Sequence, residues 1–282
     1  MAAKVTTRPN TFYQRLWQRS LADLWRYRDA VRGLTLLSLR TRYNHSILGF
    51  LWSLGNPLFF LAIFAFVNQV MFANRTANYS IFALSALIPW NFFQAGMMSA
   101  MNSITGGRYL ITKLAFPREI LPLSGILAEL VNSSIALLVI VLVDLLVERT
   151  LSPALLLLPL LGFLLLLFTA GVGLLLATVN VWLRDTQEFM AVFTFGWFFL
   201  TPIIYAISAV PADQALLGIP LRTMIQVVNP MSIFVSAFRD VIYNHVAPDG
   251  GSLLLMSVLA FGLFTIGLLV FRRASAFFAE AA

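Results

Sequence analysis

The sequence predicts an all-α polytopic membrane protein with six transmembrane helices, an N-terminal amphipathic interface helix, and a re-entrant outer hairpin between helices five and six. Three observations support this fold class. Apolar residues make up 60% of the 282-residue chain and charged residues only 11%. The apolar residues form long runs, several of which reach the roughly 20 residues that a helix needs to cross a bilayer core. The basic residues are concentrated beside these runs, as is typical of loops that stay on the cytoplasmic side.

The composition also excludes several kinds of chemistry. The chain has no cysteine, and its two histidines are His45 and His245. Disulfides and thiolate metal sites are therefore excluded, and we expect neither a metal site nor redox chemistry. The net charge is +7, and the basic residues that produce it lie beside the apolar runs, where they can contact anionic membrane lipid. We expect no nucleic-acid partner.

Residues 1–45 are predicted to be a cytoplasmic interface region. Arginines alternate here with apolar residues such as Leu16 and Trp25, a pattern that favours a helix lying along the lipid headgroups. An ordinary basic flank of the first span is the alternative. The first apolar run begins too far along the chain for a cleavable signal peptide, so we expect it to be retained.

Residues 46–272 are predicted to form a six-span bundle within a single transmembrane domain, 1–282. The expected spans are 47–72, 81–104, 121–147, 154–183, 189–210 and 253–271. Basic residues follow the second, fourth and sixth spans, so both termini are predicted to be cytoplasmic in a multi-pass protein.

Residues 211–251 are predicted to form the outer gate hairpin. Asn229 and Pro230 interrupt an apolar stretch, and proline breaks a helix. Two half-length helices would enter and leave the outer leaflet, which is tolerated where protein covers the backbone. An interfacial outer loop is the alternative. A single full span would place the C-terminal arginines outside, against the charge bias.

Four stretches carry a resemblance to a known family. They are RTRYNHSILGFLWSLGNPL at 40–58, KLAFPREILP at 113–122, NVWLRD at 180–185, and NPM at 229–231 with FRD at 238–240. Together they resemble the membrane subunits of ATP-binding-cassette polysaccharide exporters, the permeases for O-antigen, capsule and teichoic acid. His45 and Ser46 depart from this pattern, since relatives often carry a more basic or amide-rich pair.

The resemblance implies a homodimer around a central channel, driven by a separate nucleotide-binding ATPase subunit. It implies an undecaprenyl-linked polysaccharide as substrate and the bacterial inner membrane as location. No G-x-x-x-x-G-K-S/T phosphate loop occurs in the chain, so ATP and Mg are expected on the partner and no cofactor on this chain. This chain is not predicted to be an enzyme. An exporter of teichoic acid, lipid or drug and an enzyme acting on lipid-linked sugars are the alternatives.

The resemblance also suggests functional residues. A basic loop bounded by glycines and prolines looks like the family's coupling helix for the ATPase, with a plain cytoplasmic loop as the alternative. Its residues are Lys113, Leu114, Ala115, Phe116, Pro117, Arg118 and Glu119.

Aromatic residues of the first, second and fifth spans are candidates to line the channel, because sugar rings can slide over aromatic faces. Each ring alone could equally belong to an interfacial belt or face lipid. The candidates are Phe59, Phe60, Trp90, Phe93, Trp197, Phe198, Phe199 and Tyr205. Candidate gate residues are Asn229, Pro230, Arg239 and Asp240; Arg239 and Asp240 could instead simply cap a loop helix.

Two further charged sites are expected to be structural. Arg184 and Asp185 could form a local ion pair, with Asp185 capping the fifth span. Glu129 lies in the third span, where a lone carboxylate is costly. It could act in a proton relay, lie near the inner headgroups, or pair with Asn132 or Ser133.

Overall fold

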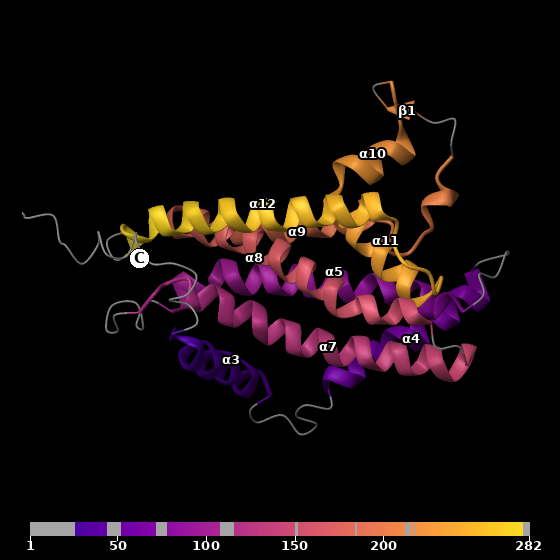
Figure 1. Ribbon diagram of the computed structural model, residues 1–282, viewed down its shortest axis with the longest axis horizontal. Coiled ribbons are helices and arrows are strands. Elements are labelled where there is room, and N and C mark those ends of the chain that lie inside the picture. The colour runs from indigo at the N-terminus through magenta and orange to yellow at the C-terminus, as the bar shows by residue number, and fades with distance from the viewer. Residues whose placement is uncertain are drawn as a thin grey trace, which may run out of the picture.

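The computed structural model describes residues 26–43, 52–71, 78–107, 116–149, 152–183, 185–211, 215–216 and 218–278. Most of its helices run side by side along the long axis of the molecule (Figure 1). The elements are α3 (Arg28–Tyr43), α4 (Trp52–Met71), α5 (Tyr79–Gly106), α7 (Ile120–Glu148), η2 (Pro153–Leu157), α8 (Leu158–Trp182), α9 (Thr186–Leu200), η3 (Ile207–Ala209), β1 (Ala215–Leu216), β2 (Ile219–Pro220), α10 (Leu221–Val228), α11 (Pro230–Ile242) and α12 (Gly250–Ser275).

Four segments of the described chain are long and apolar enough to cross a membrane. They are Tyr79–Gly106, Ile120–Glu148, Pro153–Trp182 and Gly250–Ser275. These coincide with the second, third, fourth and sixth predicted spans. The first predicted span corresponds to α4, which contains a shorter apolar stretch, Leu58–Val67. All-α architecture with several membrane-length helices is therefore established.

The fifth predicted span is shorter as a helix than expected. It corresponds to α9, which has 15 residues and ends at Leu200, although the apolar run continues to residue 210. Fifteen residues rise only about 22 Å, less than a bilayer core of about 30 Å. Thr201 takes an extended conformation because it precedes Pro202, and the ring of a proline disfavours helical backbone at the residue before it.

Helix α5 lies at the centre of the bundle. It packs against α7, α8, α4 and α11, and 78% of its apolar 18-residue stretch is buried inside the molecule. Trp90 and Phe93 are among its fully buried side chains, with 1% and 0% exposure. Much of the apolar core is therefore organised around one helix, which the other helices surround.

Helices α8 and α12 approach each other through two glycines. A Cβ atom on Gly267 would lie 2.4 Å from the backbone oxygen of Gly171, and one on Gly171 would lie 2.5 Å from the backbone of Leu263. Small residues allow such close backbone contact between membrane helices. Any larger residue at either position would push the two helices apart.

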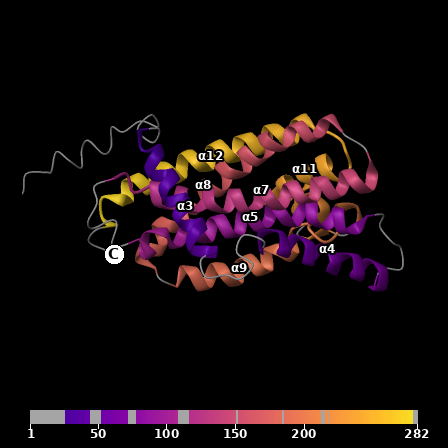
Figure 2. The same cartoon turned by 90° about the horizontal axis from the view of Figure 1, so that it is seen from below.

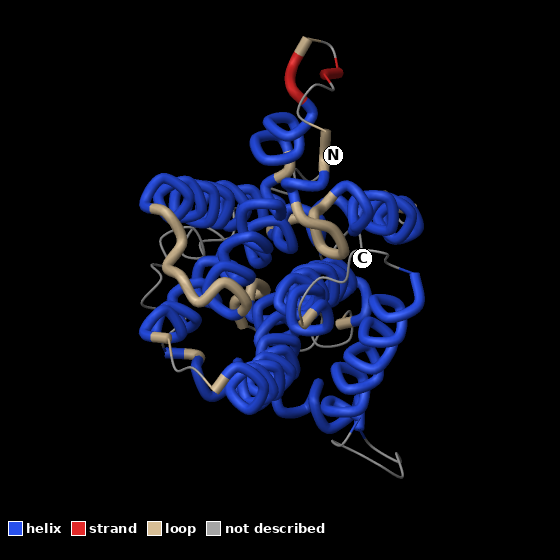
Figure 3. The backbone as a smooth tube through the Cα atoms, turned by 90° about the vertical axis from the view of Figure 1, so that its right-hand side faces the viewer, coloured by secondary structure: helices blue, strands red, loops and turns tan. Residues whose placement is uncertain are grey.

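The predicted hairpin region contains two short helices, α10 and α11, which separate at Asn229 as the position of Pro230 predicts. A small antiparallel pair, β1 and β2, precedes them, with Leu216 opposite Ile219. Figure 3 looks along the bundle and shows this pair projecting away from the helices. The sequence did not suggest these strands.

Helix α3 lies beside α7 at one end of the molecule and runs across the bundle rather than along it (Figure 2). The predicted interface residues before Arg26 lie outside the described residues. We call this end the basic end, defined by α3, residues 116–119 and Arg272. The opposite end, which holds α10, α11 and the start of α12, is called the hairpin end (Figure 1).

Candidate functional site

At the basic end, an ion pair joins α3 to α7. Both terminal guanidinium nitrogens of Arg42, Nη1 and Nη2, donate to the carboxylate of Glu129, with 2.8 Å between Nη1 and Oε2. The Glu129 side chain is 6% exposed and that of Arg42 is 48% exposed. Glu129 is therefore paired with an arginine of the interface region, a partner that the sequence analysis did not suggest. Thr35 adds a second link, since its hydroxyl donates to the backbone oxygen of Ser124 at 3.3 Å.

The candidate coupling segment is described only from Phe116 to Glu119, and Lys113, Leu114 and Ala115 lie outside the described residues. Residues 116–119 form a bend and turn that lead into α7. Glu119 is 6% exposed and contacts Arg272 of α12, with 3.0 Å between Nη2 and Oε1. Arg118 donates to the backbone oxygen of Ser275. The end of this segment is thus attached to the end of α12.

Arg184, of the predicted Arg184–Asp185 pair, lies outside the described residues. The prediction that Asp185 caps the following helix is wrong: its side chain accepts no cap hydrogen bond from α9. Asp185 has helical backbone angles, whereas a capping residue usually has extended ones.

The candidate channel residues fall into three groups. Trp90 and Phe93 of α5 are buried inside the subunit, whereas Phe59, Phe60 and Phe199 are 65%, 37% and 51% exposed. The remaining three, Trp197, Phe198 and Tyr205, are half-buried. In this conformation the two α5 rings therefore contact other side chains and present no open surface.

Trp197 connects the α5 rings to α9. Its ring centroid lies 5.8 Å from that of Trp90 and 5.3 Å from that of Phe93, both edge to face. On α9, Phe193 stacks beside Phe189 and lies 5.5 Å from Trp197. Phe189 and Phe193 are exposed candidates that the sequence analysis omitted. Their spacing of four residues from one another and from Trp197 places all three on one helix face and could have identified them.

Asn229 brings a candidate gate residue and a candidate channel residue together. Its Oδ1 accepts from Trp197 Nε1 at 2.8 Å and from the backbone N–H of Met231 at 3.1 Å, which caps α11. Its Nδ2 donates to Thr201 Oγ1 at 2.9 Å. The side chain is 8% exposed. One buried amide thus joins the end of α9 to the start of α11, with Pro230 in the first turn of α11.

Arg239 and Asp240 form hydrogen bonds with different partners. Arg239 is 7% exposed, donates to the backbone oxygen of Ile203 at 2.7 Å and to that of Phe82 at 3.3 Å, and lies 3.8 Å above the Phe82 ring. Asp240 accepts from Asn244 at 2.8 Å. Arg239 therefore joins α11 to α5 and to the segment after α9. The sequence analysis treated Arg239 and Asp240 together and did not predict these contacts.

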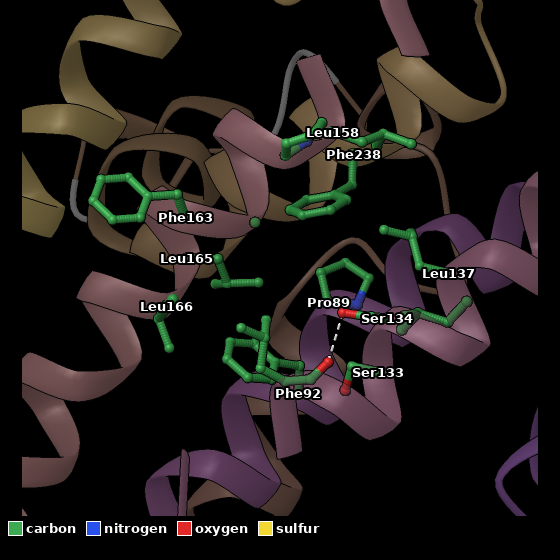
Figure 4. Close-up of a pocket in the computed structure, with 14 residues that line it drawn as sticks. Pro89, Phe92, Ser133, Ser134, Leu137, Leu158, Phe163, Leu165, Leu166 and Phe238 are labelled. Atoms are coloured by element: carbon green, nitrogen blue, oxygen red, sulfur yellow. Dashed lines mark hydrogen bonds between the residues drawn. The ribbon is translucent and has the colours of Figure 1, made fainter. Parts of the chain in front are cut away.

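A cavity of about 410 Å³ opens between α5, α7 and α8. Figure 4 shows Pro89, Phe92, Leu137, Phe163 and Phe238 around it. Ser133 and Ser134 also line it, and the Ser134 hydroxyl already donates to the backbone oxygen of Leu130 at 2.7 Å. Apart from these two hydroxyls the described lining offers hydrocarbon contacts, and it includes no ionisable side chain. Within the described part of the chain, no group of three or more histidine, aspartate or glutamate residues could hold a metal ion.

Comparison with known proteins gives one family match and several relatives. The O-antigen export system permease protein RfbA of Myxococcus xanthus is 27% identical over 262 residues, which cover 93% of this chain and 98% of that protein. A protein of the same name from Klebsiella pneumoniae is 27% identical over 89% of this chain and 94% of its own length. The polysialic acid transport protein KpsM of Escherichia coli is 22% identical over 86% of this chain and 92% of its own length.

The family model described as ABC-2 type transporter matches residues 30–243. This match runs from α3 through α11 and includes the Arg42–Glu129 ion pair, the aromatic face of α9 and the Asn229 junction. Because it covers most of the chain, it shows that this protein belongs to the ABC-2 type transporter family of membrane proteins.

Proposed function

We propose that this chain is the channel-forming subunit of an exporter that moves undecaprenyl-linked polysaccharide across the bacterial inner membrane. Three relatives with similarity over most of their lengths are named for O-antigen export or polysialic acid transport. In this proposal α4 supplies the first span, and α9 together with the apolar residues that follow it to residue 210 supplies the fifth. These two complete a six-span bundle with the four membrane-length segments. The hairpin of α10 and α11 enters the outer leaflet as a gate.

The exposed aromatic face of α9 is the observation that carries the channel proposal. Phe189 and Phe193 are 65% and 47% exposed, while the neighbouring rings of α5 are buried. Sugar rings present C–H faces that stack on aromatic rings. In a homodimer, the α4 and α9 faces of the two copies would surround one shared path, with Phe59 and Phe60 contributed by α4.

The basic end lies in the cytoplasm in this proposal, because arginines and lysines favour that side. Both termini lie there, and the N-terminal region with α3 rests on the inner headgroups. A separate ATPase subunit, which holds ATP and Mg, contacts residues 113–119. Its motion reaches the bundle through Glu119 and Arg272, whose ion pair lies at the end of α12.

The test uses cells that make a surface polysaccharide and lack only the gene for this chain. We expect surface polysaccharide to be lost and lipid-linked glycan to accumulate in the inner membrane, measured by immunoblot and lipid extraction. Complementation by the wild-type chain restores export. Replacement of the phosphate-loop lysine in the ATPase partner should reproduce the defect.

A matched pair of variants tests the aromatic face. Phe193→Ala should reduce export several-fold, whereas Phe261→Ala should not, because Phe261 is an equally exposed ring on α12. Transport by the purified chain alone, driven by an ion gradient without any ATPase, would refute the proposal.

A further inference from the structure

A second cavity, of about 270 Å³, lies at the hairpin end between α10, α11 and the start of α12. Its lining differs from that of the apolar cavity, because polar groups from all three helices converge on it. Aliphatic side chains such as Ile233 and Leu255 complete its wall. The polar residues are Gln226, Ser232, Ser236, Asp240 and Ser252.

Ser232 is the most informative of these residues. It is 1% exposed, and its hydroxyl has no hydrogen-bond partner among the described residues. Helical serines often donate to the carbonyl three or four residues earlier; Ser85 does the former here, and Ser134 and Ser257 donate to the carbonyl four residues earlier. Ser232 lies in the first turn of α11, so that carbonyl belongs to Val228 of the preceding helix.

Buried hydroxyls without a partner are rare and costly, so this one calls for a partner that the described residues do not supply. The cavity is far larger than the roughly 10–15 Å³ that one water needs. Its volume is just below the range of about 300–1,000 Å³ typical of small-molecule sites. A single ring-sized molecule suits this space better than an extended chain.

The lining decides the chemical class of the occupant. Among the described residues that line the cavity there is no lysine or arginine, which disfavours a phosphate or another anion. Asp240 is the one carboxylate among these described lining residues, which is too few for a hard cation. Three hydroxyls, an amide and a carboxylate offer both donors and acceptors, and the aliphatic wall offers apolar contact. A neutral ring that carries several hydroxyl groups and has apolar C–H faces matches this combination.

We propose that this cavity is a binding subsite for one sugar ring of the exported glycan. The proposal rests on the proposed function for the identity of the glycan, but the site itself is defined by the cavity and the unpaired hydroxyl. Ser232 donates to a sugar hydroxyl, and Asp240 accepts from one. Asn244 holds the Asp240 carboxylate in place through its 2.8 Å hydrogen bond.

The experiment measures binding to the full-length chain in phosphatidylcholine nanodiscs, which contain no free glycerol hydroxyls. The probes are the methyl glycosides of glucose, galactose, mannose and rhamnose, with binding followed by saturation-transfer NMR. We expect at least one glycoside to bind. Ser232→Ala and Asp240→Asn should each weaken its apparent affinity by about three- to tenfold, the loss of one hydrogen bond.

Ser134→Ala is the matched control, since that hydroxyl lies in the apolar cavity and is already bonded. Its glycoside affinity should equal that of the wild type. Ser232→Ala should also leave the unfolding temperature unchanged or raise it, because it removes an unsatisfied buried group. A purely structural serine would lower the unfolding temperature when replaced.

Three results would overturn the proposal. They are no binding of any glycoside, equal binding by the wild type and both cavity variants, and equal binding of free glycerol. The export assay in cells is independent of this measurement. If no glycoside binds, the result of the deletion and complementation assay still stands. If export does not depend on this chain, glycoside binding to the cavity can still be measured.

Discussion

The two ends of the bundle are held together by different interactions. At the basic end, carboxylates pair with arginines from distant segments: Glu129 with Arg42, and Glu119 with Arg272. At the hairpin end, Arg239 and Asn229 bond to backbone oxygens, a hydroxyl and an indole, and both are almost fully buried. Partly exposed ion pairs are weak and depend on salt, whereas buried hydrogen bonds to the backbone do not. The basic end is therefore suited to rearrangement, and the hairpin end to staying assembled.

Arg239→Met should produce the largest loss of stability. It leaves the Ile203 carbonyl without its arginine donor, takes one donor from the Phe82 carbonyl, to which the Ser85 hydroxyl still donates, and removes the cation above the Phe82 ring. We expect the free energy of unfolding to fall by about 3 kcal/mol, measured by SDS titration in mixed micelles. Arg222→Met is the matched control, because Arg222 also donates to two carbonyls but in a more exposed setting. Equal losses for the two variants would contradict the role given to burial.

Asn229→Ala should have the next largest effect. The change removes the cap of α11 and leaves the Trp197 indole N–H without its acceptor. We expect a loss of about 2 kcal/mol. A double-mutant cycle with Trp197→Phe should show a coupling energy of about 1 kcal/mol. Additive losses would mean that the Trp197–Asn229 bond does not join α9 to α11. Asn244→Ala, at an exposed amide, should cost much less.

Arg42→Met tests the basic end. It leaves the Glu129 carboxylate buried without its arginine partner, so we expect a loss of about 1–2 kcal/mol, and Glu129→Gln should cost less. Because Arg42 is half exposed, salt at about 1 M should reduce the loss. The loss caused by Arg239→Met should not change with salt. An Arg42→Met loss that is independent of salt would remove the difference between the two ends.

The smallest effect is expected at Asp249, the exposed cap of α12. Hydrogen bonds from the side chain and the backbone N–H of Ser252 hold the pKa of Asp249 below its ordinary value. The ionised carboxylate therefore stabilises the fold above its unfolded pKa of about 3.9, and this contribution is lost as the pH falls through the lower folded pKa. Asn also caps helices but does not titrate. The difference in unfolding temperature between wild type and Asp249→Asn should shrink as the pH falls below about 4. A constant difference would show that the charge contributes nothing.

Hydropathy located the long helices well, because each run of apolar residues ends at charged or polar residues. Hydropathy overestimated the length of α9, because Pro202 ends the helix although the apolar residues continue. The break at Asn229 was predictable for the same reason, since Pro230 changes the backbone in a known way. Local rules of this kind act over a few residues and can be read from sequence.

The contacts of the candidate site could not be predicted in this way. Arg42 and Glu129 are 87 positions apart, and Arg239 reaches a carbonyl on α5 that is 157 positions away. Which charged groups meet depends on how the helices pack, and several arginines were available for each carboxylate. The burial of Trp90 and Phe93 has the same origin, because an aromatic ring in a span gives no sign of whether it faces lipid, a path or another helix.

The glycine contact between α8 and α12 has a consequence for movement. The backbones of α8 and α12 are in contact at Gly171 and Gly267, so neither helix can slide along the other without losing this contact. We therefore expect the two helices to move together as one rigid unit. Helix α12 is about 39 Å long, with Arg272 at one end and Ser252, beside the polar cavity, near the other. A force at Glu119 that tilts these two helices together would therefore alter the width of the polar cavity at the hairpin end, without any change in the helices themselves.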